Sequence, residues 1–142
     1  MKKVLLDLNI ILDLLTKRMD HESAVKLFDY CAKKKAQGYV CSHEITTLAY
    51  FLTKEKFNKF KRNSILSKLL DHLRILTANE KALRNALTSQ IEDYEDAVIE
   101  ELSYQESIDF LVTRDLKDFK KSRKKVYTAA EAVRLLESEE HA

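Results

Sequence analysis

Four acidic residues follow short apolar segments or lie in predicted helix starts, although they are spread over most of the chain. They are Asp7, Glu44, Asp96 and Asp115. If the apolar segments are strands of one parallel sheet, these carboxylates lie at its carboxyl edge, which is where ligands bind in such sheets.

Such a cluster of carboxylates predicts a bound metal ion. Two carboxylates about 5 Å apart repel each other by about 3 kcal/mol at an effective dielectric constant of about 20. The group is therefore stable only if some members are protonated or a cation lies among them. Ligands that are all oxygen favour Mg²⁺ or Mn²⁺, so the pattern predicts a metal-dependent enzyme.

Three polar residues near the first two acids allow more than one interpretation. Asn9 forms Asp-x-Asn with Asp7, and it is either the N-cap of the next helix or a site residue. Asp13 lies one turn further on and could reach the same region, although an acid there is more often on the helix surface. His43 adjoins Glu44 but points elsewhere in a helix, so we expect it to serve packing or to face solvent.

The later acids also have polar neighbours that could support the site. Asp93 lies three residues before Asp96 on one helix face, although an acid at a helix start also complements the helix dipole. Thr113 can position a carboxylate or a water molecule through its hydroxyl. Asp118 either joins Asp115 at the site or caps the following turn.

The composition indicates one folded domain over residues 1–142, with 45% hydrophobic and 34% charged residues. The formal net charge of +2 is too small to indicate a nucleic-acid partner by itself. With no secretory signal in view, Cys31 and Cys41 are expected to be free thiols in a cytoplasmic protein. The first apolar run is too short for a membrane span. Gly38 is the single glycine, which disfavours the glycine-rich loops that bind nucleotides, and the cysteines lack zinc-site spacing.

The order of predicted elements favours an α/β fold with three α/β/α layers and a central parallel sheet of four to five strands. Apolar runs predict strands at residues 4–6, 39–41, 73–76, 108–113 and 126–127. We expect Asn9, Ser42, Asn79 and Thr128 to be N-caps of helices. Other helices are predicted at residues 22–36, ended by Gly38, at 54–68 and at 93–103; the one after Asn79 should reach Thr88.

Four motifs in order resemble those of a PIN domain, and they span residues 4 to 119. They are Val4-Leu5-Leu6-Asp7-Leu8-Asn9, Ser42-His43-Glu44-Ile45, Asp93-Tyr94-Glu95-Asp96-Ala97 and Val112-Thr113-Arg114-Asp115-Leu116-Lys117-Asp118-Phe119. The similarity is greatest to compact bacterial PIN proteins of the VapC-like toxin kind. It implies a Mg²⁺- or Mn²⁺-dependent ribonuclease whose metal-binding acids are Asp7, Glu44, Asp96 and either Asp115 or Asp118. It also implies products with a 5′-phosphate and a 3′-hydroxyl, a homodimer, and an antitoxin that occupies the groove.

Two basic stretches could bind the phosphates of RNA; the alternative is that both are solvated surfaces. The first, interleaved with Phe57 and Phe60, contains Lys54, Lys56, Lys59, Lys61, Arg62 and Lys68. The second follows the fourth predicted strand and contains Lys117, Lys120, Lys121, Arg123, Lys124 and Lys125. Besides a toxin-like ribonuclease, two other functions stay open: an RNA-binding module without turnover, and another Mg²⁺-dependent phosphotransfer domain.

Overall fold

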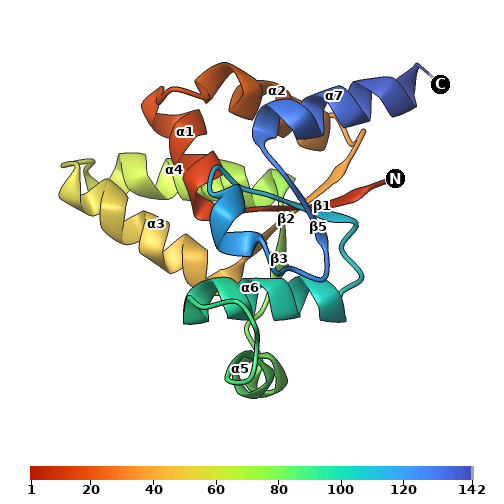
Figure 1. Cartoon of the computed structure of the whole chain (residues 1–142). Helices are drawn as coiled ribbons and strands as arrows, with labels where there is room; N and C mark the ends of the chain where they lie inside the picture. Colours follow the sequence, from red (N-terminus) through yellow and green to blue (C-terminus); the bar gives the residue numbers. More distant parts are fainter. Residues whose placement is uncertain (142) are drawn as a thin grey trace.

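Five parallel strands form the centre of the computed structural model, which describes residues 1–141 (Figure 1). The strand order is β3-β2-β1-β4-β5, so β1 lies in the middle. The strands are β1 (Lys3–Leu6), β2 (Gln37–Cys41), β3 (Arg74–Leu76), β4 (Phe110–Val112) and β5 (Lys125–Tyr127). This arrangement confirms the predicted α/β class and the parallel sheet.

Helices cover both faces of the sheet. They are α1 (Leu8–Thr16), α2 (His21–Ala32), α3 (Ser42–Lys54), α4 (Lys59–His72), α5 (Glu80–Ala86), α6 (Tyr94–Gln105) and α7 (Ala129–Glu140), with a 3₁₀ helix, η1 (Leu116–Phe119). Because side chains alternate along a strand, Val4 and Leu6 face the core shared with α1, α2, α3, α4 and α7, whereas Leu5 faces α5 and α6. The three layers follow from this alternation.

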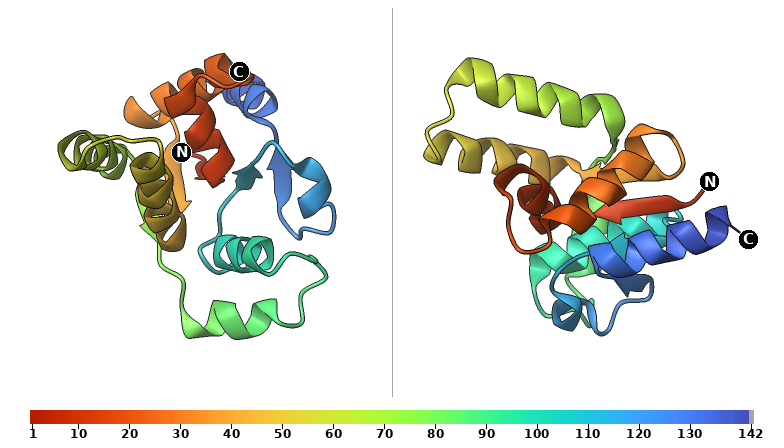
Figure 2. Two further views of the ribbon diagram at one scale, coloured as in Figure 1. Left: turned by 90° about the vertical axis from the view of Figure 1, so that its left-hand side faces the viewer. Right: turned by 90° about the horizontal axis from the view of Figure 1, so that it is seen from above.

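Register places the ends of the strands level with one another. Leu5 pairs with Tyr39 of β2 and with Leu111 of β4. The carboxyl ends of β1, β2 and β4 therefore meet at one edge, and the left view of Figure 2 looks onto it, with α1, α3, α6 and η1 arranged around it. None of the helices in residues 1–141 combines the length and the apolar character needed to cross a membrane.

Some helix boundaries agree with the sequence analysis. Asn79 caps α5 by accepting a hydrogen bond from the Ala82 amide at 2.8 Å, and Thr128 caps α7 in a capping box with Glu131. The two cysteines are free and buried, as expected.

The predicted N-caps Asn9 and Ser42 are wrong. The N-cap positions are Asp7 and Cys41, because each helix begins directly where its strand ends. The Ser42 hydroxyl instead accepts a hydrogen bond from the Ala78 amide at 3.3 Å. This bond ties the start of α3 to the segment after β3.

Gly38 does not end a helix, and the helix predicted over residues 22–36 ends at Ala32. Gly38 lies inside β2, where a Cβ would come within 2.7 Å of both Cys31 Sγ and Leu73 Cδ2. Close packing therefore requires glycine at this position.

The helix predicted over residues 54–68 is also wrong in its bounds. α3 runs to Lys54 and α4 begins at Lys59, after Asn58 caps it by accepting from the Lys61 amide at 2.8 Å. The first basic stretch lies on this α3–α4 hairpin, which extends away from the rest of the chain (Figure 2, right). Similarly, α5 stops at Ala86 and not at Thr88.

Candidate metal centre

A cavity of about 380 Å³ lies at the carboxyl edge of the sheet and is lined mainly by acidic side chains. Its lining residues are Asp7, Leu8, Asn9, Asp93, Glu95, Asp96, Asp115, Asp118 and Phe119. Of the four acids singled out from the sequence, all but Glu44 line it. Of the four residues expected to support them, all but Thr113 line it. No lysine, arginine or histidine lies among these lining residues, so nothing in the cavity wall offsets their charge. We call this group the acidic cavity.

Asp7 is held at the edge by contacts to β4. Its backbone amide donates to the Val112 carbonyl at 3.0 Å, and its Oδ2 accepts a hydrogen bond from the Thr113 hydroxyl at 2.8 Å. The same hydroxyl oxygen accepts a bond from the Asp115 amide at 3.1 Å. Thr113, although absent from the cavity wall, therefore links the first and the last acid of the site.

Asp115 and Asp118 are both exposed on the wall formed by η1. Asn9 Nδ2 donates to Asp115 Oδ2 at 3.4 Å, so the side chain of Asn9 faces the site from the first turn of α1. This contact to Asn9 and the bond to Thr113 favour Asp115 over Asp118 as the acid placed beside Asp7.

Glu44 lies beneath the cavity and is 1% exposed. Its Oε2 accepts a hydrogen bond from the Leu8 amide at 2.9 Å, where the N-terminus of α1 favours negative charge. Its Oε1 has no hydrogen-bond partner within residues 1–141. Burial, and then the neighbouring Asp7 carboxylate, raise the pKa of Glu44 well above its ordinary value. An additional proton or cation would satisfy this oxygen.

Asp96 is half-buried in the first turn of α6, where Asp93 accepts a hydrogen bond from the Asp96 amide at 3.0 Å. Burial, and then the charges of Asp93, Asp7 and Asp118, raise the pKa of Asp96 to about 7. Asp93 therefore both caps the helix and adds charge to the site.

We predict that the metal-free protein loses stability as the pH rises from about 4 to 7. In this range the folded protein keeps the Asp96 proton that the unfolded chain releases, so the free energy of unfolding decreases with pH. Glu44 acts in the same direction. Melting temperatures between pH 4 and 8 in excess chelator measure this effect. Asp96→Asn should flatten the curve; an unchanged pH dependence in that variant would contradict the prediction.

The donor set fits Mg²⁺ or Mn²⁺, because every polar side chain in the cavity wall offers at least one oxygen atom. The amide of Asn9 adds a nitrogen, which is not a ligand for these ions. Within residues 1–141, no three acid, histidine or cysteine side chains come close enough together to chelate one ion directly. Mg²⁺ is usually bound by one or two carboxylates and keeps several water ligands. Asp7 and Asp96 both line the cavity and offer two carboxylates for binding of that kind.

The structure also shows polar groups that the sequence analysis did not identify. Glu95 lines the cavity, although its position between Asp93 and Asp96 gave no reason to prefer it. Asp13 is fully buried and pairs with Arg114 at 3.2 Å, so its expected place on the helix surface is wrong. No local pattern marks this pair, because the two residues are 101 positions apart.

His43 packs partly inside the protein, which agrees with the first of the two positions expected for it, packing or facing solvent. Both of its ring nitrogens are buried and lack a hydrogen-bond partner within the described chain. It does not line the acidic cavity.

Arg123, predicted to bind RNA, makes an ion pair within the protein instead. Its side chain donates to Glu100 at 2.6 Å and to Glu101 at 2.5 Å, and its guanidinium lies 4.1 Å from the centre of the Tyr104 ring. These carboxylates raise its pKa. The pairing ties the segment before β5 to α6. The lysines of the second basic stretch remain as the candidates for phosphate contact.

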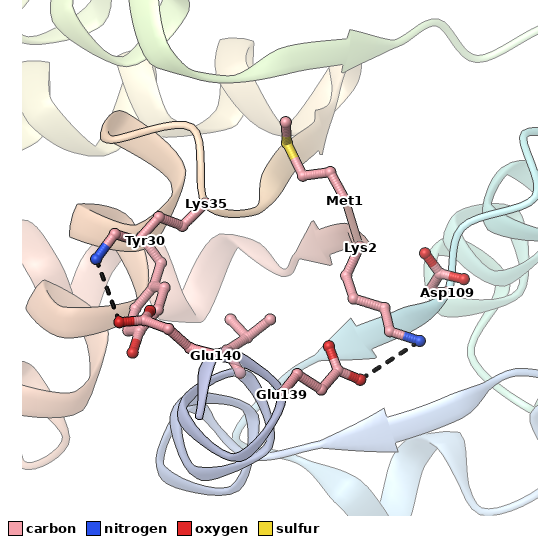
Figure 3. A pocket seen from close by; sticks show the side chains of 8 residues that line it. Met1, Lys2, Tyr30, Lys35, Asp109, Glu139 and Glu140 are labelled. Carbon is pink, nitrogen blue, oxygen red and sulfur yellow. Dashed lines mark hydrogen bonds and ion pairs between the residues drawn. The ribbon is translucent and has the colours of Figure 1, made fainter. Parts of the chain in front are cut away.

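A larger cavity, of about 680 Å³, lies at the opposite edge of the sheet (Figure 3). Four of its charged side chains form ion pairs, Lys2 with Glu139 at 3.5 Å and Lys35 with Glu140 at 3.4 Å, and Asp109 accepts a hydrogen bond from the Lys3 amide. It contains none of the acids that gather at the carboxyl edge, so its size does not make it the better candidate.

Comparison with known proteins agrees with this architecture. Residues 3–117 match the family model of the PIN domain. VapBC2 from Rickettsia felis, solved bound to a DNA fragment from its promoter, is 25% identical with a TM-score of 0.65, over 87% of this chain and 96% of that one. FitAcB from Neisseria gonorrhoeae is 20% identical with a TM-score of 0.67, over 89% and 98%.

A more distant structure shares the same fold. VapC20 from Mycobacterium tuberculosis, a toxin that cleaves the sarcin–ricin loop, is 11% identical with a TM-score of 0.60, over 76% of this chain and 86% of that one. Among curated proteins, no sequence matches this chain.

Proposed function

The chain belongs to the PIN-domain family, and on that basis we propose that it is a metal-dependent endoribonuclease, the toxin of a toxin–antitoxin pair. The observation that carries this proposal is the acidic cavity, where carboxylates from three separate segments converge without a basic residue among them. The activity of the VapC20 neighbour on the sarcin–ricin loop supports RNA as the substrate class.

We assign the metal-binding role to Asp7, Glu44, Asp96 and Asp115. A divalent cation bound there would neutralise phosphate charge and lower the pKa of a water molecule that attacks phosphorus. The chain's own residues position the acids: Thr113 holds Asp7 and the Asp115 backbone, and the Leu8 amide orients Glu44. This division of roles needs no side-chain nucleophile.

A toxin of this kind would act with a protein partner. By its resemblance to VapC-like proteins, we propose that the chain forms a homodimer and that an antitoxin blocks its groove. The structures of VapBC2 and FitAcB, which share this fold, support the proposal of an antitoxin partner. Co-expression with the product of the adjacent reading frame, followed by size-exclusion chromatography, tests the partner.

We expect single-stranded or looped RNA to be cleaved in the presence of Mg²⁺ or Mn²⁺ and to stay intact in excess chelator. The physical reason is that only a cation at the uncompensated acids can offset the charge of the phosphate that is cleaved and lower the pKa of the attacking water. Labelled RNA and gel electrophoresis measure this directly. Equal cleavage with metal and with chelator would refute the metal-dependent mechanism, and binding without cleavage would identify an RNA-binding module instead.

A further inference from the structure

A cleft continues from the acidic cavity along one side of the molecule. The acidic cavity shares Asp93 and Asp118 with a neighbouring cavity of about 590 Å³. That cavity in turn shares Gln90 and Lys121 with a third, of about 390 Å³. Because each cavity shares two lining residues with the next, the three adjoin one another. We call them together the lateral cleft; it lies between the segment that joins α5 to α6 and the segment of η1.

Three lysines of the second basic stretch line this cleft. Lys117, Lys120 and Lys121 are all exposed, and Lys117 and Lys120 face the cavity next to the acids. None of the three forms an ion pair within residues 1–141, although Glu92, Asp93 and Asp118 line the same cavity. Their charges are therefore available to a ligand.

The walls of the cleft are held in place by buried contacts. On one side Ile91 is 6% exposed, and its amide donates to the Ser89 hydroxyl at 3.0 Å. On the other side Phe119, the last residue of η1, packs into the core. Arg123 then ties the segment after η1 to α6. A ligand would meet a formed cleft, so little entropy is lost in ordering it.

From this geometry we propose that an RNA strand leaves the acidic cavity through the lateral cleft, with Lys117, Lys120 and Lys121 contacting its backbone phosphates. The inference rests on the proposed ribonuclease function, because it takes the acidic cavity as the place of cleavage. The uncharged polar side chains of Asn85, Thr88, Ser89 and Gln90 line the far part of the cleft. Asn85, Thr88 and Ser89 already bond within the protein. Gln90, by contrast, is exposed and available to sugars and bases. Arg123 is engaged by Glu100 and Glu101, and neither Lys124 nor Lys125 lines any of the three cavities.

Two double variants with the same change in charge test this proposal. Lys120→Gln with Lys121→Gln removes two cleft lysines, and Lys124→Gln with Lys125→Gln removes two nearby lysines outside it. Binding of a labelled single-stranded RNA is titrated at several salt concentrations in excess chelator, so that cleavage plays no part. Thermal unfolding shows whether both variants fold as the parent does.

The cleft variant should bind RNA more weakly, and its slope of log K against log salt should be smaller by about 1.4, since each lost phosphate contact removes about 0.7 for a single strand. The control variant should keep the parental slope. The proposal would be overturned if the two variants had the same slope of log K against log salt, or if both lost the same amount of RNA affinity. It would also be overturned if the parent protein did not bind RNA. Cleavage with Mg²⁺ is measured separately, so a protein that fails to cleave can still show the difference in slope.

Discussion

Asp7→Asn and Asp96→Asn should each lower RNA cleavage by more than about 100-fold, because losing even an outer partner of a metal ligand typically costs 10- to 100-fold. Both carboxylates line the acidic cavity and approach it from different elements, the end of β1 and the start of α6. An amide keeps the size of the side chain but removes the charge that a divalent cation needs. Single-turnover cleavage at saturating Mg²⁺ measures the loss.

The same substitutions should leave the metal-free protein as stable as the parent or more stable. Each removes one member of a mutually repelling group, so the melting temperature in chelator should stay or increase. Asp71→Asn, on the exposed surface of α4, provides a control with the same chemical change. Near-normal cleavage by either site variant would show that its carboxylate is not a metal ligand, and a large loss in the control would show that the assay does not report on the site.

Arg123→Met should lower the free energy of unfolding by about 2–3 kcal/mol, because two buried carboxylates would lose their cation. Breaking a fully buried pair costs about 3–5 kcal/mol, and we take a smaller value since the Arg123 side chain is 47% exposed. Glu100, by contrast, is 2% exposed and accepts bonds from the Arg123 backbone amide and guanidinium. Urea unfolding measures the change.

Arg84→Met is the matched control for this substitution. Arg84 also forms an ion pair, with Glu80 at 2.6 Å, but both side chains are largely exposed. Exposed pairs of this kind contribute little to stability. Similar losses in the two variants would show that burial of Glu100 and Glu101 does not decide the effect, and that Arg123 is not a structural clamp.

Signals within a few residues predicted much of this fold. The short apolar runs marked all five strands. The signal was clearest for β1, β2 and β4, since a strand buried on both faces is largely apolar. Asn79 and Thr128 were predicted as caps because the cap bonds to an amide three residues away. The four acids were proposed for a related reason: Asp7, Glu44 and Asp115 lie at or shortly after the ends of strands, at the edge where sites form, and Asp96 lies at a helix start.

The features that sequence reasoning missed depend on partners far away in the chain. Asp13 has the spacing of a surface acid, and only the fold brings Arg114 to it. Arg123 belongs to a run of cations, and nothing local distinguishes it from Lys124 until α6 places two glutamates beside it. Asn9 has a capping residue type, but β1 passes into α1 without a turn, so the cap position falls on Asp7.

The central position of β1 has a consequence for synthesis of the protein. β1 pairs with β2 on one side and with β4 on the other, and the bond from Thr113 to Asp7 joins residues 106 positions apart. A chain leaves the ribosome from its N-terminus, so Asp7 and Glu44 emerge long before Asp96 and Asp115. Until β4 arrives, one edge of β1 is unpaired and the set of acids is incomplete. The acidic cavity is therefore complete only when most of the chain has been made, and fragments released before β4 lack part of it.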